Sequence, residues 1–456
     1  MDISRLTPRA SRLITVVGSV LLLLLLASLG SRDEVARLYQ GLAAVYPIAS
    51  ASAQESGKVF NVREFGARGD GISNDTPAIQ KAIDAAPAGS TIYFPAGIYD
   101  INNFIVKNRS GLTFTGEGQK STIRQTTGAG RFATFESSRN IVITDLAFDA
   151  NGIMAFGGII FSDATDVRLE NNKFFDGAPK PWGKPDRSAF NFSRGSHTNR
   201  DIKIINNNIE NVQVDFAHSQ QVLVDRNVVK QSGKTAGIGI YSIGDGSIAE
   251  DFQITNNTVI DPLGAGFNVG IDSPTDGQCI FRRITLTGNQ VIRTNTTGYG
   301  IRMGTGNNSK PSMGNIFEDI TLKDNRLRIE KGAPAPLPLI FANSSSIAAI
   351  HFERLTVTGN TIENNGPPNQ DFAIDLRFIQ NSVVADNSVK GVANGIAVGG
   401  DLLANEIRGN VVAASEAAYA LAYSLGKNRA MNNRILGNPK EGWILTKINP
   451  SDVIVK

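Results

Sequence analysis

A short pattern of apolar and polar residues recurs along most of the chain. Two apolar residues alternate, an Asn follows three places after the second, and another apolar residue comes two places later, as in VRLENNKF. The Asn of this pattern stands at Asn172, Asn207, Asn227, Asn257, Asn289, Asn325, Asn360, Asn387, Asn410 and Asn433. Alternation of period two is typical of a β-strand. The spacing predicts a chain that coils back to the same place on each turn.

A second apolar segment precedes the pattern on most turns. On the central turns it reads Phe190-Asn-Phe192, Val214-Asp-Phe216, Phe267-Asn-Val269 and Ile301-Arg-Met303. Each turn therefore holds at least two strands, and we predict an all-β, right-handed single-stranded parallel β-helix of about 10–12 coils. A leucine-rich repeat would need regular Leu, and a β-sandwich would not return Asn to the same corner. Asn suits that corner because it tolerates the left-handed conformation and its amide can bond the Asn of neighbouring coils.

A solenoid needs caps, because an open coil exposes its apolar interior and its strand edges. Residues 74–86 predict a capping helix at the N-terminal end. The segment opens with the N-cap side chains of Asn74-Asp75-Thr76 and has Pro77 at the first helical position. Ile79 and Ile83 then place an apolar stripe on one helix face.

The segment around this cap, residues 59–99, resembles the N-terminal segment of the pectate lyase superfamily. The shared features are Val62, Phe65-Gly66-Ala67, Gly69-Asp70-Gly71, Asn74-Asp75-Thr76, Ala78-Ile79-Gln80 and Phe94-Pro95-Ala96-Gly97. The resemblance implies a right-handed β-helix but no single reaction, since polygalacturonase-like hydrolases, polysaccharide lyases, epimerases and phage tailspikes all resemble this segment. Arg68-Gly69-Asp70 also spells an adhesion tripeptide, which we interpret as the turn before the capping helix.

The N-terminus has the pattern of an export segment. Three Arg precede an uncharged apolar run from Leu13 to Gly30, which is typical of a signal peptide and just long enough for a membrane anchor. We predict a signal peptide or anchor at 1–30 and a linker at 31–57. The β-helix domain is expected at 58–440, with its cap at 58–99, and a C-terminal tail at 441–456. The expected location is secreted or in the cell envelope, extracellular or periplasmic.

Composition excludes several classes of function. With 45 Lys+Arg against 42 Asp+Glu, the net charge of +3 gives no field that would favour nucleic acid. Cys279 is the only cysteine, so the chain has no internal disulfide and no cysteine zinc site. The three histidines, His197, His218 and His351, lack ligand spacing, and no metal site is predicted. Ca²⁺ held by Asp215 and Asp272 with backbone carbonyls is the alternative that the chemistry allows.

The strand pattern predicts which side chains of the first strand face outward. The position between two inward apolar residues points out, which selects Ile160, Asn191, Asp215, Gly239, Asn268, Arg302, Ile340, Asp375 and Ala397. Two residues further on, the outward positions include Tyr241, Gly270, Gly304 and Arg377. The glycines Gly239, Gly270 and Gly304 are expected to leave room for a substrate. His218, Asp245 and Asp272 follow in the next turn of their coils. Since coils stack ~4.8 Å apart, Asp215, Tyr241, Asn268 and Arg302 should form a polar track of roughly 14 Å, the length of two or three sugar rings.

The track offers two kinds of carbohydrate chemistry. Glycoside hydrolysis needs two carboxylates, which Asp215 could form with Asp272 or Asp245. Elimination at a uronic acid needs a base, His218 or Tyr241, and a cation such as Arg302 to neutralise the sugar carboxylate; epimerisation needs the same groups and a proton donor on the opposite face. The catalytic candidates are therefore Asp215, His218, Tyr241, Asp272 and Arg302. The substrate-binding candidates are Asn191, Asp245, Asn268, Asp375 and Arg377.

Three functions follow as hypotheses. The first is an exported polysaccharide lyase or glycoside hydrolase that acts on a uronic-acid-containing polysaccharide. The second is a non-catalytic carbohydrate-binding or surface-structural β-helix, and the third is a tailspike-like adhesin. The family's catalytic signatures, such as Gly-His-Gly and Trp-x-Asp-His, are absent, so the candidate residues rest on the strand pattern alone. Exposed polar residues on a solenoid are ordinarily solvated surface, but a run of ionisable groups on the central coils favours the enzyme.

Overall fold

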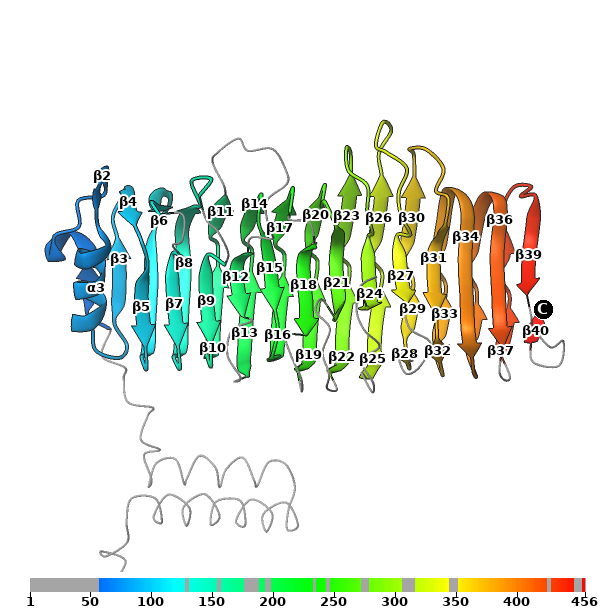
Figure 1. Cartoon of the computed structure of the whole chain (residues 1–456), viewed down its shortest axis with the longest axis horizontal. Helices are drawn as coiled ribbons and strands as arrows, with labels where there is room; N and C mark the ends of the chain where they lie inside the picture. Colours follow the sequence, from blue (N-terminus) through cyan, green and yellow to red (C-terminus); the bar gives the residue numbers. More distant parts are fainter. Residues whose placement is uncertain are drawn as a thin grey trace, which may run out of the picture. The chain divides into compact units, whose positions relative to one another are not determined.

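The described residues form a solenoid. In this computed structural model they are residues 57–127, 131–153, 157–175, 188–192, 198–232, 235–242, 247–271, 279–305, 316–343, 352–424, 428–446 and 453–455. The coils follow one another along the axis in sequence order (Figure 1). Neighbouring coils pair through parallel strands, which confirms the predicted right-handed parallel β-helix. A typical coil has three strands, and we call the three stacks A, B and C in chain order within a coil.

The strand bounds give the three stacks. Stack A, which holds the predicted first strands, contains β5 (Phe104–Lys107), β7 (Ala133–Glu136), β9 (Ile159–Ser162), β12 (Ser188–Phe192), β15 (Gln213–Phe216), β18 (Ala236–Ser242), β21 (Ala265–Ile271), β24 (Ile301–Thr305), β27 (Ile340–Asn343), β31 (Phe372–Arg377) and β39 (Glu441–Thr446). Stack B contains β1 (Val59–Asn61), β3 (Thr91–Phe94), β10 (Thr165–Glu170), β13 (Asn199–Ile205), β16 (Ser219–Asp225), β19 (Ile248–Thr255), β22 (Ile280–Thr287), β25 (Ile316–Lys323), β28 (Phe352–Glu353), β29 (Thr356–Thr358), β32 (Ile379–Gln380), β33 (Val383–Ala385), β35 (Glu406–Arg408), β37 (Asn428–Met431) and β40 (Val453–Val455). Stack C contains β2 (Asp70–Asn74), β4 (Gly97–Ile101), β11 (Lys173–Phe175), β14 (Asn208–Glu210), β17 (Val228–Lys230), β20 (Thr258–Ile260), β23 (Gln290–Arg293), β26 (Arg326–Ile329), β30 (Thr361–Asn364) and β38 (Arg434–Ile435). Four longer strands run from one stack into the next, namely β6 (Ser110–Gln125), β8 (Arg139–Asp149), β34 (Ser388–Leu402) and β36 (Val411–Ser424).

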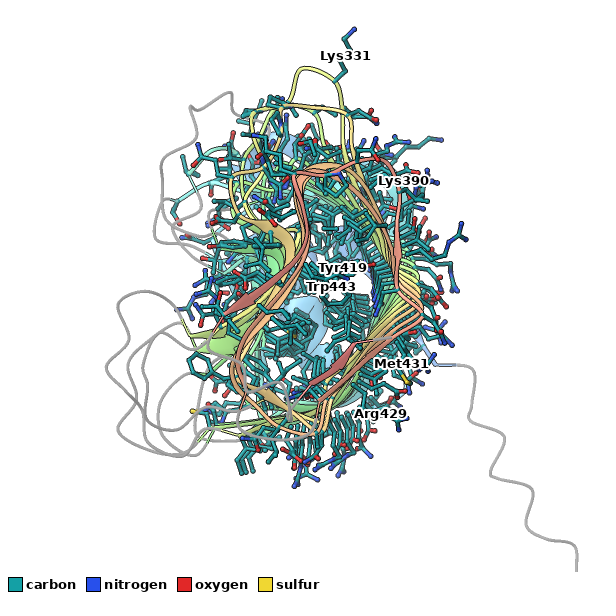
Figure 2. All side chains as sticks on the ribbon, turned by 90° about the vertical axis from the view of Figure 1, so that its right-hand side faces the viewer. Lys331, Lys390, Tyr419, Arg429, Met431 and Trp443 are labelled. Carbon is teal, nitrogen blue, oxygen red and sulfur yellow. The ribbon has the colours of Figure 1, made fainter. Side chains whose placement is uncertain are left out.

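The interior is filled by the inward residues of every strand, as the view along the axis shows (Figure 2). Stack A contributes a column of phenylalanines, Phe135, Phe161, Phe192 and Phe216, all fully buried. Their rings stack from coil to coil with centroid distances of 5.0, 4.5 and 5.3 Å. The alternation read from the sequence is therefore the alternation of core and surface.

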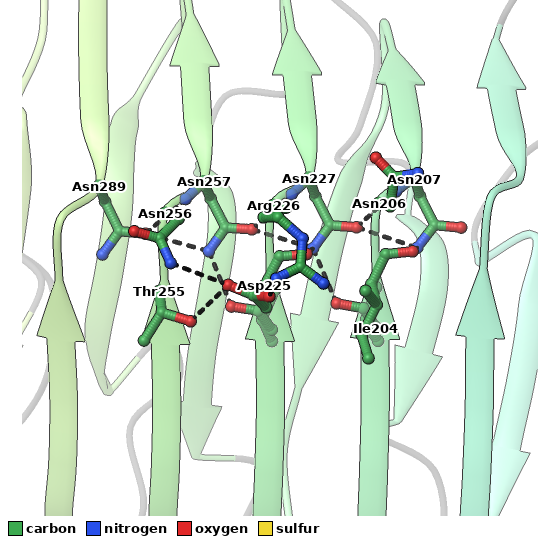
Figure 3. A network of polar contacts seen from close by, with 12 residues as sticks. Ile204, Asn206, Asn207, Asp225, Arg226, Asn227, Thr255, Asn256, Asn257 and Asn289 are labelled. Atoms are coloured by element: carbon green, nitrogen blue, oxygen red, sulfur yellow. Dashed lines mark hydrogen bonds and ion pairs between the residues drawn. The ribbon is translucent and has the colours of Figure 1, made fainter.

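The repeated Asn forms a continuous buried ladder at the corner between stacks B and C (Figure 3). The Oδ1 of Asn257 accepts from the backbone N–H and from the Nδ2 of Asn227, each at 2.9 Å. The Nδ2 of Asn257 donates to the carbonyl of Val224 at 2.8 Å and to Oδ1 of Asn289 at 3.0 Å. The same bonds repeat from Asn172 to Asn433, so the predicted ladder is confirmed.

The left-handed conformation at this corner belongs to the residue before each ladder Asn. Asn171, Asn206 and Asn256 have φ values of 57°, 55° and 55°, whereas the ladder residues have ordinary negative φ. Gly288 and Gly359 occupy the same position on later coils with φ of 66° and 67°. The expectation that the ladder Asn itself is left-handed was wrong. The two tasks of the corner, turning the chain and bonding the next coil, fall on adjacent residues.

The helix α3 (Thr76–Ala85) covers the N-terminal end, after the short 3-10 helix η2 (Val62–Phe65) (Figure 1). It buries Ala78, Ile79, Ala82 and Ile83, as the apolar stripe predicts. The side chain of Asp75 does not cap the helix; its carboxylate instead accepts from the N–H groups of Arg68 and Gly69, at 2.7 and 3.0 Å. Burial raises the pKa of this carboxyl.

The side chain of Gln80 in α3 bonds the backbone of β5 as a neighbouring strand would. Its amide donates to the carbonyl of Ile105 at 3.0 Å and accepts from the N–H of Ile105 at 2.9 Å. This pair of bonds protects the free edge of β5, which is where an open sheet would recruit another strand.

The expected signal or anchor (1–30) and the expected linker (31–57), apart from Gly57, lie outside the described residues. Within the part of the chain that the structure describes, no helix is long and apolar enough to cross a membrane. In the expected C-terminal tail, β39 pairs with β36 in stack A and β40 pairs with β37 in stack B, so both strands continue the solenoid.

Candidate functional site

The predicted outward positions of stack A fall into one register column. Asn191 pairs with Asp215, Asp215 with Gly239, Gly239 with Asn268, and Asn268 with Arg302 on successive coils. The strands that carry these residues are β12, β15, β18, β21 and β24 of stack A, which lie side by side in the middle of the solenoid (Figure 1). Three coil spacings separate Asp215 from Arg302, which is about 14 Å.

The column continues with a residue that the sequence pattern missed. Arg302 pairs with Phe341, and Phe341 pairs with Asp375, which in turn pairs with Ala397. The prediction that Ile340 faces outward was wrong, since Ile340 is fully buried and Phe341 is partly exposed. Leu339, Ile340 and Phe341 are all apolar, so the hydrophobic pattern could not fix the phase of this strand.

Asp215 is held by neighbours on its own sheet. Its side chain accepts hydrogen bonds from Nε2 of Gln213, 3.0 Å from each carboxylate oxygen, and from the hydroxyl of Ser188. Nδ2 of Asn191 lies 3.4 Å from that same hydroxyl. Only 8% of Asp215 is exposed. The carboxylate is therefore fixed in position on the face, with polar groups of β12 and β15 around it.

Tyr241 lies over Gly239 on its own strand. A Cβ placed on Gly239 would come within 2.2 Å of the Tyr241 ring and hydroxyl, so the ring occupies the space of the missing side chain. The phenol thereby reaches the column between Asp215 and Asn268, and Tyr241 is 7% exposed. The expectation that Gly239 leaves room for a substrate was wrong, because Tyr241 fills that room.

At the other two outward glycines, Gly270 and Gly304, the backbone of the next coil comes so close that a side chain would not fit. A Cβ on Gly270 would lie 2.1 Å from the carbonyl oxygen of Gly304. Gly304 has φ of 105°, and a Cβ on it would lie 1.9 Å from the carbonyl oxygen of Asn343. These two glycines permit close backbone packing and do not provide an open space.

His218 lies at the corner that follows β15. Its φ is 46°, and its Nε2 is 3.0 Å from the hydroxyl oxygen of Ser247, which precedes β19 on the next coil. The imidazole is partly exposed. The structure therefore places His218 in the corner three residues after Asp215, with its Nε2 within hydrogen-bond distance of Ser247.

Arg302 lies beside two aromatic rings. Its guanidinium carbon is 5.4 Å from the ring centroid of Tyr299, and the rings of Tyr299 and Phe341 are 5.0 Å apart at 30°. All three side chains are partly exposed. A cation over an aromatic face is an attractive arrangement that also orients the guanidinium.

A buried arginine holds the loop that carries Tyr299. The guanidinium of Arg293 is fully buried and donates to the carbonyl oxygens of Pro262, Gly264, Thr297 and Tyr299 and to the hydroxyl of Thr296. Burial lowers its pKa to about 10, so the group stays charged at neutral pH. Asp261 accepts from the N–H and hydroxyl of Thr294, each at 2.6 Å. Loop 294–300 is thus fixed from both sides.

Asp375 and Arg377 bind each other. Nε and one terminal nitrogen of Arg377 donate to the two carboxylate oxygens of Asp375, at 3.0 and 2.9 Å. This bond raises the pKa of Arg377. Asp375 is 4% exposed. The pair is a bidentate ion pair within one strand, which makes these two residues poorer candidates for substrate binding than Arg302.

Two predicted site residues, Asp245 and Asp272, lie outside the described residues, as do His197 and His351. The Ca²⁺ site expected from Asp215 and Asp272 stays a prediction for this reason. Among the described residues, no three His, Cys, Asp or Glu side chains gather in a way that could hold a metal ion.

Sequence reasoning missed Ser188, Gln213, Tyr299 and Phe341. Gln213 could have been found, because it stands two residues before Asp215 and alternation places both on the same side of a strand. Tyr299 lies in a loop whose path depends on Arg293 and Asp261, and no local signal reveals it.

Comparison with known proteins finds relatives that match short parts of the chain. Mannuronan C5-epimerase AlgE3 of Azotobacter vinelandii is 39% identical over 109 residues, which is 20% of this chain and 6% of the epimerase. Alginate lyase 7 of the same organism is 36% identical over 110 residues, 20% of this chain and 13% of the lyase. The exo-poly-α-D-galacturonosidase of Dickeya chrysanthemi is 55% identical over 42 residues, 9% of this chain and 7% of that enzyme. The chain thus matches a small part of each relative.

Solved structures share the fold at low identity. The surface adhesin PfbA of Streptococcus pneumoniae superposes with a TM-score of 0.59 at 17% identity, over 77% of this chain and 90% of the adhesin. The pre-mature gene product 12 of bacteriophage phi29 superposes with a TM-score of 0.61 at 13% identity, over 92% of this chain and 60% of that protein.

Two family profiles match the chain. One of them, described as periplasmic copper-binding protein (NosD), matches residues 346–455. Copper prefers Cys, Met and His side chains, yet this segment contains one His, His351, one Met, Met431, and no Cys. The donor set does not fit a copper site within the segment.

The family profile described as rhamnogalacturonase A/epimerase, pectate lyase-like, matches residues 59–320, which is more than half of the 456 residues. This range holds the capping helix and the column from Asn191 to Arg302. The chain therefore belongs to the rhamnogalacturonase A/epimerase, pectate lyase-like family.

Proposed function

We propose that this chain is a carbohydrate-active β-helix protein that acts on a uronic-acid-containing polysaccharide along the outer face of stack A. The observation that carries the proposal is the register column of Gly239, Asn268 and Arg302 on neighbouring coils, in which the ring of Tyr241 lies over Gly239. A column along the axis suits a polymer, because each coil meets the next part of the same ligand. We further propose that the reaction moves a proton next to the sugar carboxylate, as elimination or epimerisation.

The roles follow from the chemistry of each group. Arg302 neutralises the uronate carboxylate, which makes the neighbouring C–H acidic enough to lose its proton. Tyr241, whose ring lies over Gly239 of the column, or His218, at the corner after the strand of Asp215, accepts or returns that proton, since both can exchange protons. Asn268 binds sugar hydroxyls between them. Asp215, fixed by Ser188 and Gln213, positions the substrate from the other end.

Hydrolysis stays the alternative reaction. It requires a second carboxylate beside Asp215 at about 5–9.5 Å. Along the described part of the column, Asp375 is engaged by Arg377, so the partner would have to be Asp245 or Asp272. The described residues thus support proton transfer at a uronate more directly than two-carboxylate hydrolysis.

The relatives support the substrate class. Their names include a mannuronan epimerase, an alginate lyase and a galacturonosidase, and each of these polymers contains uronic acid. An extracellular or envelope location is supported by the N-terminal pattern of Arg residues and apolar run, and by the matches to a periplasmic family and a surface adhesin.

A non-catalytic carbohydrate-binding protein is the second candidate. It is favoured by the way the carboxylates of Asp215 and Asp375 are bonded within the face, since a group that is already satisfied can position a ligand without reacting. A tailspike-like adhesin belongs to the same candidate, because it would need binding alone.

The test incubates the full chain with alginate, polymannuronate, polygalacturonate and a neutral glucan. Absorbance of the unsaturated uronate detects elimination, reducing ends detect hydrolysis, and deuterium uptake at C5 from D₂O detects epimerisation. We expect absorbance or deuterium uptake with an acidic polymer, and loss of at least a hundredfold in Arg302→Gln and Tyr241→Phe.

Arg326→Gln is the matched control, because Arg326 is half exposed on stack C and pairs with Glu363 away from the column. It should keep full activity. Reducing ends without absorbance would replace the proposed reaction by hydrolysis. Binding without any turnover would overturn the enzyme and leave the carbohydrate-binding protein.

A further inference from the structure

Tyr299 and Phe341 form an aromatic pair that the hydrophobic core does not explain. Their rings contact each other on the outer face of stack A, and both stay partly exposed. The partly buried hydrophobic residues that pack against the described core are Phe65, Ile435 and Trp443, and the pair is not among them. Large apolar side chains that gather at the surface outside the core commonly mark a binding site.

The pair is built rigidly. Tyr299 lies in loop 294–300, where the carbonyls of Thr297 and Tyr299 accept from the buried guanidinium of Arg293. The carbonyl of Tyr299 also accepts from the N–H of Gly266 at 3.0 Å, and Gly298 has φ of 125° with the carbonyl of Gly264 where its Cβ would be. A loop fixed in this way holds its aromatic ring in place before a ligand arrives, which lowers the entropic cost of binding.

The position of the pair defines the ligand. Phe341 is the next residue after Arg302 in the register column, one coil further from Asn268 and Tyr241. A sugar ring has an apolar face of C–H groups that packs on aromatic rings, while its hydroxyls stay in water. A cation lies directly beside the rings, so a sugar that stacks there has its acidic neighbour at Arg302.

We propose that Tyr299 and Phe341 form a subsite that binds the sugar residue next to the reacting uronate, on the side away from Asp215. The inference rests on the proposed position of the polysaccharide along stack A, but it does not depend on turnover. It implies that the polymer runs along the solenoid axis, from Asp215 past Arg302 to Phe341, over about four coil spacings or roughly 19 Å.

The test separates stacking from charge. Binding of galacturonate and mannuronate hexamers, and of the same hexamers with reduced carboxyl groups, is measured by titration calorimetry on the full chain carrying Tyr241→Phe, so that turnover does not consume the ligand. We expect Phe341→Ala to weaken the binding of charged and of reduced hexamers by the same factor of about ten, because stacking does not need the carboxylate. Arg302→Gln should weaken the binding of the charged hexamers and leave that of the reduced hexamers unchanged.

Two further variants complete the design. Phe341→Tyr should restore binding, because it restores the ring. Phe175→Ala is the matched control: Phe175 lies on stack C, is also partly exposed, and has the Lys173 ammonium 5.0 Å from its ring centroid. In the wild type, Phe341→Ala should raise KM and leave kcat unchanged, as expected for binding that the ground state and the transition state share.

The outcomes distinguish this inference from the proposed function. Hexamer binding that Phe341→Ala weakens, without turnover in the wild type, would overturn the enzyme and support the subsite. Turnover with unchanged binding in Phe341→Ala, or an equal loss in Phe175→Ala, would overturn the subsite alone. If no hexamer binds, both are wrong, and the aromatic pair belongs to an interface with another kind of partner.

Discussion

A ladder Asn uses both ends of its amide inside the solenoid wall. Asn257 accepts from Asn227 and donates to Val224 and Asn289, and it is fully buried. Asn257→Ala leaves buried donors and acceptors unpaired, at about 1–3 kcal/mol for each group. We expect the free energy of unfolding to fall by about 3–5 kcal/mol, measured by denaturant unfolding.

The neighbouring residue provides the control. Asn256 is exposed and left-handed at φ of 55°, so Asn256→Gly keeps the turn and loses one side-chain bond to Asp225. Its cost should stay below about 1 kcal/mol. Equal losses in the two variants would mean that the ladder adds no stability beyond an ordinary turn.

Gly239 decides where the Tyr241 phenol lies. Gly239→Ala places a methyl group within 2.2 Å of the ring, so the ring must swing away from the column. If Tyr241 transfers the proton, the variant should lose turnover about as strongly as Tyr241→Phe. The melting temperature should change little, because the displaced ring is not part of the hydrophobic core. Thermal unfolding and the absorbance assay on the same sample check both halves of this prediction. Full activity in Gly239→Ala would exclude Tyr241 as the reacting group.

At the scale of one element, the conformation of loop 294–300 depends on the planar guanidinium of Arg293. Four carbonyl oxygens surround the guanidinium, and a lysine ammonium cannot reach them in the same planar geometry. Arg293→Lys should lower the free energy of unfolding by about 2–4 kcal/mol and weaken hexamer binding. Arg328→Lys, on the adjacent strand of stack C and paired with Glu330 near the surface, should change neither. An unaffected Arg293→Lys would mean that the loop is held by Asp261 alone.

Elements with one buried face were predictable from the sequence, and loops were not. The inward pairs such as Phe190 and Phe192 fix the register of β12 because a shift by one residue would expose them. The same alternation placed Asp215, Asn268 and Arg302 correctly in one column. It failed at β27, where three apolar residues in a row give no phase. The approach of Tyr241 to Gly239 depends on side-chain rotation, which no pattern of residue types encodes.

For the whole solenoid, ion pairs on the outer faces tie one coil to the next. On stack B, Arg283 pairs with Asp251 and Glu250, and Arg354 pairs with Asp319 and Glu318. The bond from Arg283 lowers the pKa of Asp251, and that from Arg354 lowers the pKa of Asp319. At the cap, hydrogen bonds from Ser73 and Ile72 lower the pKa of Asp70 to about 2. Each of these acids is thus ionised more readily in the folded chain than in the unfolded one.

Acid should therefore unfold the solenoid in a defined window. A carboxyl whose pKa is lower in the folded state stabilises the fold above its ordinary pKa near 3.8, and this contribution is lost as pH falls towards the folded value. The melting temperature should stay level from pH 7 to 5 and fall between pH 4 and 2. Arg354→Gln removes the partner of Asp319 and should make that fall shallower, whereas Arg200→Gln, also exposed on stack B, should not. High salt should reduce the difference between wild type and Arg354→Gln, because surface pairs are screened. A fall that begins between pH 7 and 5 would assign the acid sensitivity to groups other than these carboxylates.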